Sequence, residues 1–296
     1  MTQKYRTVVL GNFDGLHKGH QQLIRLGREI ADQNGEELAV FTFYPQIQEL
    51  FDPAFCYLLP EEKKAERLGQ LGVDVLQTVP FDAQIAQLTP ETFVKTILVE
   101  KMHAQHVVVG FNYTFGYQGA GNPEKLQELC SQYGISVTVM EPCCVDDEIV
   151  SSSTIRSYLK DGRIEKVNEM LGYVYTVSGV VCQGNQIGRT IGFPTANIMA
   201  PPKLLLPANG VYAALTKVDG VTYPGILNIG LRPTIKNSVG INIEVNLFHF
   251  DADIYGKEIE IGIRYFLRSE VKFSGLEALK AQLEKDKAQT RQLFQL

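Results

Sequence analysis

The sequence has no long apolar run. No stretch of its 296 residues approaches the roughly 20 apolar residues that a membrane-spanning helix needs, and the first residues, MTQKYRTVVLGNFDG, contain no apolar signal core. We therefore expect a soluble protein that stays in the cytoplasm and has no membrane partner. Low-complexity tracts and repeats of about 20 to 50 residues are missing too, which argues against disordered arms and solenoids.

An excess of positive charge is also missing. The chain has 28 Lys and Arg against 33 Asp and Glu, which gives a net charge of -5. Because a protein that coats nucleic acid needs a basic surface, we expect no nucleic-acid partner. No motif predicts an oligomeric state.

The five cysteines form no recognisable metal or redox pattern. Their number is odd, and they include no C-x-x-C pair and no Cys/His ligand spacing, which favours reduced, buried thiols. Cys143 and Cys144 are adjacent and would bridge poorly, so we expect both to be structural residues buried at a strand end.

Short β-branched runs alternate with helical periods up to about residue 172. Runs at 7–10, 38–43, 73–79, 106–109 and 135–140 predict strands. Residues 20–31 and 90–102 have helical spacing, and Pro90 suits a helix start. This alternation predicts an α/β domain with a parallel sheet, in which ligands bind beyond the C-terminal ends of the strands.

Strand-like segments then follow one another without long helices. They lie at 174–182, 211–218, 221–229, 241–250 and 257–267, and Asp219-Gly220 predicts a hairpin between two of them. Only residues 275–294 have a helical pattern. We expect two domains, residues 1–172 and residues 173–296, the second an antiparallel barrel or sandwich closed by a C-terminal helix.

The segment GNFDGLHKGH, residues 11–20, follows the first predicted strand. Its histidines are three residues apart with little carboxylate nearby, which fits zinc poorly, and the chain has no G-x-x-x-x-G-K-[ST] run. Glycines ahead of a helix leave backbone N–H groups for an anion, and His17 and His20 can each donate to phosphate oxygens. The alternative is a capped glycine turn without a ligand.

The string F-D-G-x-H-x-G-H resembles the H-x-G-H signature of the nucleotidyltransferase superfamily. Within it, the segment looks like the adenylyltransferase half of the bifunctional riboflavin kinase/FAD synthetases of bacteria. The resemblance implies a Rossmann-like domain in which His17 and His20 are catalytic and stabilise the transferred phosphate. It also implies ATP contacts at Gly11, Asn12, Phe13, Asp14 and Gly19.

Two later segments extend the resemblance. GFNYTFG (110–116) and VSSSTIR (150–156) are similar to further motifs of this family. They imply ATP contacts at Asn112, Ser152, Ser153 and Arg156, of which the serines alone would predict only a helix cap.

Three stretches of the first domain depart from the family pattern. FTFYP (41–45) is followed by Gln46-Ile47, Thr154 stands where arginine is common, and GYQGAG (116–121) lacks arginines. These departures leave open an alternative, a riboflavin kinase with weak or lost adenylyltransferase activity. A second alternative, a flavin-binding regulatory module without turnover, predicts bound flavin that ATP does not consume.

GRTIGFPTANI, residues 188–198, resembles the G-x-P-T-A-N element of riboflavin kinases, a six-stranded barrel that phosphorylates an alcohol without a P-loop. The resemblance implies ATP contacts at Gly188, Arg189, Gly192 and Pro194. It also implies that Thr195 and Asn197 bind Mg²⁺, for which their oxygens are suitable ligands.

The polar face of residues 241–250 contains Glu244, which by pattern alone is a solvated glutamate. The resemblance implies instead that Glu244 is the base that takes the proton of the riboflavin hydroxyl. Arg268, in FLRSEVKF (266–273), is either a flavin or phosphate contact or a surface arginine. The implied reactions are ATP and riboflavin to FMN and ADP, and ATP and FMN to FAD and pyrophosphate, both with Mg²⁺.

Overall fold

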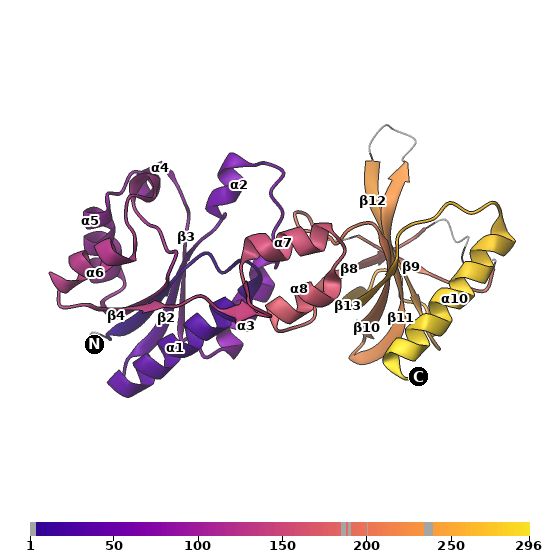
Figure 1. The fold of residues 1–296 in the computed structure, drawn as a ribbon, viewed down its shortest axis with the longest axis horizontal. Coiled ribbons are helices and arrows are strands. Elements are labelled where there is room, and N and C mark those ends of the chain that lie inside the picture. The colour runs from indigo at the N-terminus through magenta and orange to yellow at the C-terminus, as the bar shows by residue number, and fades with distance from the viewer. Residues whose placement is uncertain (1–3, 185–187, 189–190, 200, 234–238) are drawn as a thin grey trace. The chain divides into compact units, whose positions relative to one another are not determined.

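The computed structural model describes residues 4–184, 188, 191–199, 201–233 and 239–296 (Figure 1). The chain divides into two compact units, Met1–Ser152 and Ser153–Leu296. In the described ranges, no helix combines the length and apolar character that crossing a membrane would require.

The N-terminal unit contains a five-stranded parallel sheet in the order β3-β2-β1-β4-β5. Its strands are β1 (Arg6–Leu10), β2 (Glu37–Phe43), β3 (Val75–Val79), β4 (Ala104–Gly110) and β5 (Ser136–Met140). All five lie where the β-branched runs predicted them, so the predicted parallel sheet is confirmed.

The helical segments of this unit connect the parallel strands. They are η1 (Asp14–Leu16), α1 (Lys18–Asn34), α2 (Ile47–Phe51), α3 (Glu61–Gln70), α4 (Ala83–Ala86), α5 (Pro90–Phe93), η2 (Val94–Lys101), η3 (Tyr117–Gly119) and α6 (Pro123–Ser131). Pro90 begins α5, as predicted, and the helix continues into the π-helical turns of η2. A two-stranded hairpin, β6 (Cys144–Val145) with β7 (Glu148–Ile149), follows β5.

Alternate residues of β1 face two separate cores. Val9 packs with Ile24 and other residues of α1, whereas Val8 and Leu10 pack with the side chains of η2 and α6 on the other face of the sheet. The period of two along the strand therefore covers both faces of a buried sheet. At Gly27 the backbone of α1 comes so close to the sheet that an added Cβ would lie 2.5 Å from Val9 Cγ2.

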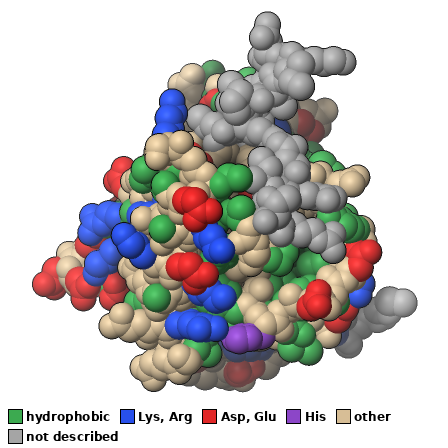
Figure 2. All heavy atoms as spheres, turned by 90° about the vertical axis from the view of Figure 1, so that its right-hand side faces the viewer, with side chains coloured by type: hydrophobic (Ala, Val, Ile, Leu, Met, Phe, Trp, Pro, Cys, Tyr) green, Lys and Arg blue, Asp and Glu red, His purple; other side chains and the backbone are tan. Residues whose placement is uncertain are grey.

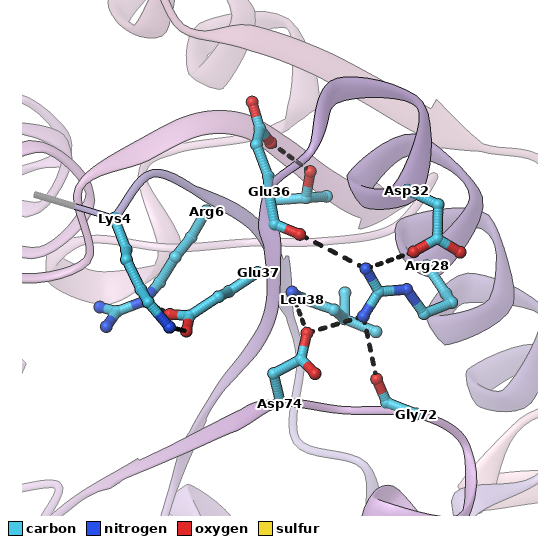
Figure 3. A network of polar contacts seen from close by, with 10 residues as sticks. Lys4, Arg6, Arg28, Asp32, Glu36, Glu37, Leu38, Gly72 and Asp74 are labelled. Carbon is cyan, nitrogen blue, oxygen red and sulfur yellow. Dashed lines mark hydrogen bonds and ion pairs between the residues drawn. The ribbon is translucent and has the colours of Figure 1, made fainter. Parts of the chain in front are cut away.

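A polar network ties α1 to the start of strand β2 (Figure 3). Arg28 pairs with Asp74 at 2.7 Å and with Asp32 at 2.6 Å, and Asp74 Oδ2 also accepts the backbone N–H of Leu38 at 2.8 Å. These contacts lie at the N-terminal edge of the sheet. They fasten the scaffold at the edge opposite to the one where ligands of such sheets bind.

The C-terminal unit is a closed antiparallel barrel in the order β10-β11-β12-β9-β8-β13. Its strands are β8 (Thr176–Cys182), β9 (Ala196–Met199), β10 (Gly210–Val218), β11 (Val221–Pro233), β12 (Val239–Leu247) and β13 (Glu258–Arg268), and α10 (Leu276–Phe294) follows them. The predicted hairpin is confirmed, with Val218 opposite Val221 and positive φ at Asp219 and Gly220. The sixth strand, β9, has only four residues and gave no periodic signal.

Helices α7 (Ser152–Lys160) and α8 (Ile164–Leu171) lie between the sheet and the barrel in sequence. Helix α8 packs on β13, where Asn168 Nδ2 donates to the carbonyl of Ile263 at 2.9 Å. In the sequence, the division between the two compact units therefore falls between Ser152 and Ser153. The functional division at residue 172 stays a prediction.

Charged side chains of both signs share the surface. On the face that Figure 2 shows, basic and acidic side chains are interspersed, without a broad patch of one sign.

The two adjacent cysteines differ in their exposure. Cys143 is buried, as expected, but Cys144 is exposed, so the prediction that both are buried is wrong. The cause is local, because Cys144 lies on the small β6/β7 hairpin outside the main sheet.

Replacing Gly27 with alanine will destabilise the N-terminal unit by about 1–3 kcal/mol, because the new methyl group overpacks the contact with Val9. Gly69→Ala is the matched control, since Gly69 is an exposed helical glycine with nothing within 4 Å of an added Cβ. It will stabilise by about 0.5–1 kcal/mol through helix propensity alone. Urea unfolding of both variants measures the difference, and equal effects would contradict the close approach.

Candidate active sites

The first candidate site is the turn that connects β1 to α1. Gly11 and Asn12 leave the strand, Phe13 adopts a left-handed backbone with φ of 53°, and the short η1 leads to His17. Phe13 and Asp14 are buried, at 0% and 5% exposure. The turn therefore lies at the C-terminal end of a central strand, where the sequence predicted a phosphate site.

His17 caps helix α1 with its own ring. Its Nδ1 accepts the backbone N–H of His20 at 3.3 Å, so the neutral ring carries its hydrogen on Nε2 and can donate from that atom. The rings of His17 and His20 stack with centroids 3.7 Å apart and planes 16° from parallel. Gly19 between them permits this, because an added Cβ would lie 3.3 Å from the His17 ring.

Both histidines are neutral at pH 7. Burial lowers the pKa of His17 from 6.5 to about 4. Burial, the neighbouring His17 and the charge of Lys64 hold the pKa of His20 well below 6.5. Nδ1 of His20 is buried without a hydrogen-bond partner. The pair thus offers neutral hydrogen-bonding groups, one of which lacks a partner. They lie at the N-terminal end of α1, where the helix dipole favours an anion.

Other segments hold the turn in place. Asp14 Oδ1 accepts the backbone N–H of Leu58 at 3.0 Å, and the Asp14 carbonyl accepts the Ser152 hydroxyl at 3.0 Å. Thr42 Oγ1 donates to the carbonyl of Asn12 at 3.4 Å. The structure therefore brings Ser152 to the H-x-G-H turn across 138 positions of the sequence.

The remaining residues predicted for this site lie in the turn after β4 and on helix α7. Asn112 is exposed in the turn after β4. Ser153 and Arg156 lie on α7 in the C-terminal unit. Their contacts to ATP stay predictions. Lys64, which was not predicted, is buried on α3, and its charge lowers the pKa of His20. Its spacing of four residues from Leu68 on the same helix could have indicated that it is buried.

The second candidate site lies on three neighbouring strands of the barrel. Glu244 on β12 is directly opposite Asn197 on β9 and Asn228 on β11. Side chains directly opposite in adjacent strands share a face, so the glutamate stands between two asparagines. The predicted base and one predicted metal ligand are therefore neighbours, although their strands are far apart in the sequence.

Asn197 has the property expected of a metal ligand. It is 7% exposed, and its Oδ1 is buried without a hydrogen-bond partner. Gly184 makes room for its side chain, because an added Cβ there would lie 2.2 Å from Nδ2 of Asn197. A hard oxygen left unsatisfied beside a carboxylate fits Mg²⁺. Thr195, two residues earlier, is half-buried close to Gly188.

Two asparagines of β12 flank the glutamate on the same strand face. Asn242 Nδ2 donates to Glu244 Oε1 at 2.8 Å, and Asn246 Nδ2 donates to the carbonyl of Pro194 at 2.7 Å. The first bond orients the carboxylate, and the second fastens the P-T-A-N segment to β12. Gly188 and Gly192 precede the P-T-A-N residues in the segment 188–198. Arg189 of that segment lies outside the described residues.

Arg268 has a partner within the fold. Its Nε and Nη2 bind the carboxylate of Asp286 on α10 at 2.9 and 2.7 Å, and Asp286 is only 1% exposed. This two-point ion pair holds the C-terminal helix against the barrel. The contact of Arg268 with flavin or phosphate stays a prediction, because the pair with Asp286 accounts for a structural role.

Comparison with known protein families matches both halves of the chain. A family model described as FAD synthetase matches residues 1–154, and one described as riboflavin kinase matches residues 171–294. The first contains the histidine pair, and the second contains the row of Asn197, Glu244 and Asn228.

Individual relatives match over nearly the full length. The bifunctional riboflavin kinase/FMN adenylyltransferase of Listeria monocytogenes is 41% identical over 98% of this chain and 92% of its own, and that of Bacillus subtilis is 38% identical over 99% and 93%. A crystal structure described as a macrolide-efflux protein from Streptococcus pneumoniae matches with a TM-score of 0.91 and 31% identity, over 98% of this chain and 95% of its own.

The lowered pKa of His17 makes stability depend on pH. Between about pH 4 and 6.5 the unfolded chain binds a proton at His17 that the folded chain does not, so stability rises with pH in that window and is lost as the pH falls. His17→Asn keeps a cap but removes the titration. Calorimetry at pH 7 and pH 5 will show a smaller drop in unfolding temperature for the variant, and equal drops would contradict the pKa.

Proposed function

The chain belongs to the bifunctional riboflavin kinase/FMN adenylyltransferase family, and we propose that the histidine pair serves its adenylyltransferase reaction and the Glu244 row its kinase reaction. The enzyme uses ATP twice, first to make FMN from riboflavin and then to make FAD from FMN. The observation that carries the assignment is the separation of the two groups, since each lies inside a different matched family region.

In the adenylyltransferase reaction an oxygen of the FMN phosphate attacks the α-phosphorus of ATP. A new P–O bond forms, the bond to the bridging oxygen breaks, and pyrophosphate leaves. We assign His17 Nε2–H and the imidazole of His20 to the phosphate oxygens on which charge builds. Neutral rings suit this role because they donate hydrogen bonds without giving up a proton. Backbone groups of Gly11–Gly19 and the start of α1 add further donors.

In the kinase reaction the ribityl hydroxyl of riboflavin attacks the γ-phosphorus of ATP and ADP leaves. Glu244 accepts the hydroxyl proton, with Asn242 holding the carboxylate in position. Thr195 and Asn197 would hold Mg²⁺, which when bound neutralises charge on the phosphates. The unsatisfied Oδ1 of Asn197 supports this assignment.

The two reactions are assigned to residues 1–172 and residues 173–296. Helix α7 begins near the end of the first matched region, and α8 ends where the second begins. The partners are small molecules, namely ATP, riboflavin and FMN. We place both reactions in the cytoplasm, where ATP is available.

Two single variants separate the sites. Glu244→Gln will lower FMN formation from riboflavin by about 10²-fold or more and leave FAD formation from FMN unchanged. His20→Ala will do the reverse, with a loss of about 10²-fold in FAD formation. Separating the flavins after incubation with ATP and Mg²⁺ measures both activities in each sample.

Each variant is the control for the other. If Glu244→Gln makes FMN at the parent rate, Glu244 is not the base. If neither the parent nor His20→Ala makes FAD from FMN above a sample without enzyme, the chain is a kinase alone. Flavin that binds but is never converted would favour the regulatory module.

A further inference from the structure

Lys64 is a buried lysine beside the first site. It is 1% exposed, and of the lysines and arginines that the structure describes it is the one that is buried. Its helix, α3, packs against η1. The segment before α3 is fixed to the same turn by the bond from the Leu58 N–H to Asp14. The helix that carries this buried ammonium group therefore packs against the start of the H-x-G-H turn.

The ammonium is only partly satisfied by its neighbours. Nζ lies 2.6 Å from Oε2 of Glu61, but the two groups lack hydrogen-bond geometry, and the buried Nζ makes no hydrogen bond. The side chain of Glu61 is 23% exposed, against 2% for Lys64. An ion pair of this kind is a weak source of stability, because an apolar side chain of similar size would avoid the cost of burying the charge. Folding alone therefore does not explain a lysine at this position.

The charge of Lys64 reaches the histidine pair. After burial and His17, it is the third cause that lowers the pKa of His20. Because both rings are neutral at pH 7, they offer hydrogen bonds to a triphosphate but no net charge. A highly charged anion in a buried site needs a permanent cation nearby, which the pair itself does not supply.

We propose that Lys64 supplies a buried positive charge to the adenylyltransferase site and stabilises the triphosphate of ATP and the departing pyrophosphate. The inference rests on the assignment of His17 and His20 to that site. Lys64 acts through its electrostatic field at the phosphates. Glu61 moderates this charge in the free enzyme.

The test compares Lys64→Met with Lys63→Met, the neighbouring lysine whose side chain is 43% exposed. Lys64→Met will lower kcat/KM for FAD formation by about 10²-fold and weaken inhibition by inorganic pyrophosphate by at least about tenfold. Inhibition by adenosine, which carries no phosphate, will not change. Lys63→Met will stay within about twofold of the parent in every assay. FMN formation will be unchanged in both variants, because it belongs to the other site.

Glu61→Gln separates an electrostatic role from a structural one. If Lys64 supplies charge to the phosphates, removing its counter-ion will leave pyrophosphate inhibition as strong as in the parent or stronger. If the two residues are only an ion pair that holds α3, Glu61→Gln and Lys64→Met will weaken FAD formation alike, and adenosine inhibition will fall with it.

Two results would overturn the proposal. One is parallel loss in Lys64→Met and Glu61→Gln, and the other is unchanged pyrophosphate inhibition in Lys64→Met. The His20→Ala variant shows which claim has failed. Normal FAD formation in His20→Ala would refute the assignment of the site itself, whereas loss in His20→Ala with parent activity in Lys64→Met refutes the role of Lys64 alone.

Discussion

The bond from the His20 backbone N–H to His17 Nδ1 sets the geometry of the proposed adenylyltransferase site. This contact caps helix α1 and fixes the hydrogen of His17 on Nε2, and the two rings stack beside it. The stack is possible because Gly19 places no side chain against the His17 ring. Farther along the same helix, Gly27 lets α1 lie directly on the sheet. The position of the proposed phosphate-binding groups is thus determined by how closely α1 approaches β1 and by the residue that caps α1.

Contacts that hold the fold and contacts that serve chemistry lie in different places. In the N-terminal unit, the ion pairs of Arg28 fasten the edge of the sheet where the strands begin (Figure 3), and in the barrel the pair of Arg268 with Asp286 holds α10. Beside the two proposed sites, buried polar atoms are left without hydrogen bonds, namely His20 Nδ1, Lys64 Nζ and Asn197 Oδ1. Arg28 Nε and Thr216 Oγ1, which lie elsewhere, are also buried without hydrogen bonds. Such atoms cost stability in the free protein, and the phosphates of ATP or a bound metal ion would interact with the three that lie beside the proposed sites.

Sequence patterns predicted the parallel sheet well, because strands buried on both faces give unbroken β-branched runs between helices. They did not predict β9, since a four-residue strand beside glycine and proline has no period to detect. The H-x-G-H turn and Glu244 could be found from the sequence, because each lies within a short motif of neighbouring residues. Lys64 and Asn228 were missed for a different reason. Their roles depend on which elements pack together or pair, and neither α3 against η1 nor β11 against β12 can be derived from local sequence.

The central claim is that a neutral, stacked histidine pair is the phosphate-binding group of the adenylyltransferase site. Titration of the five histidines by ¹⁵N NMR tests it most directly, with His17→Asn and His20→Ala used to assign the signals. We predict that His17 stays neutral from pH 7 down to about pH 5, with a pKa of about 4 and its hydrogen on Nε2, and that the pKa of His20 lies well below 6.5. Protonation of both rings near pH 6.5, or a hydrogen on Nδ1 of His17, would contradict the claim.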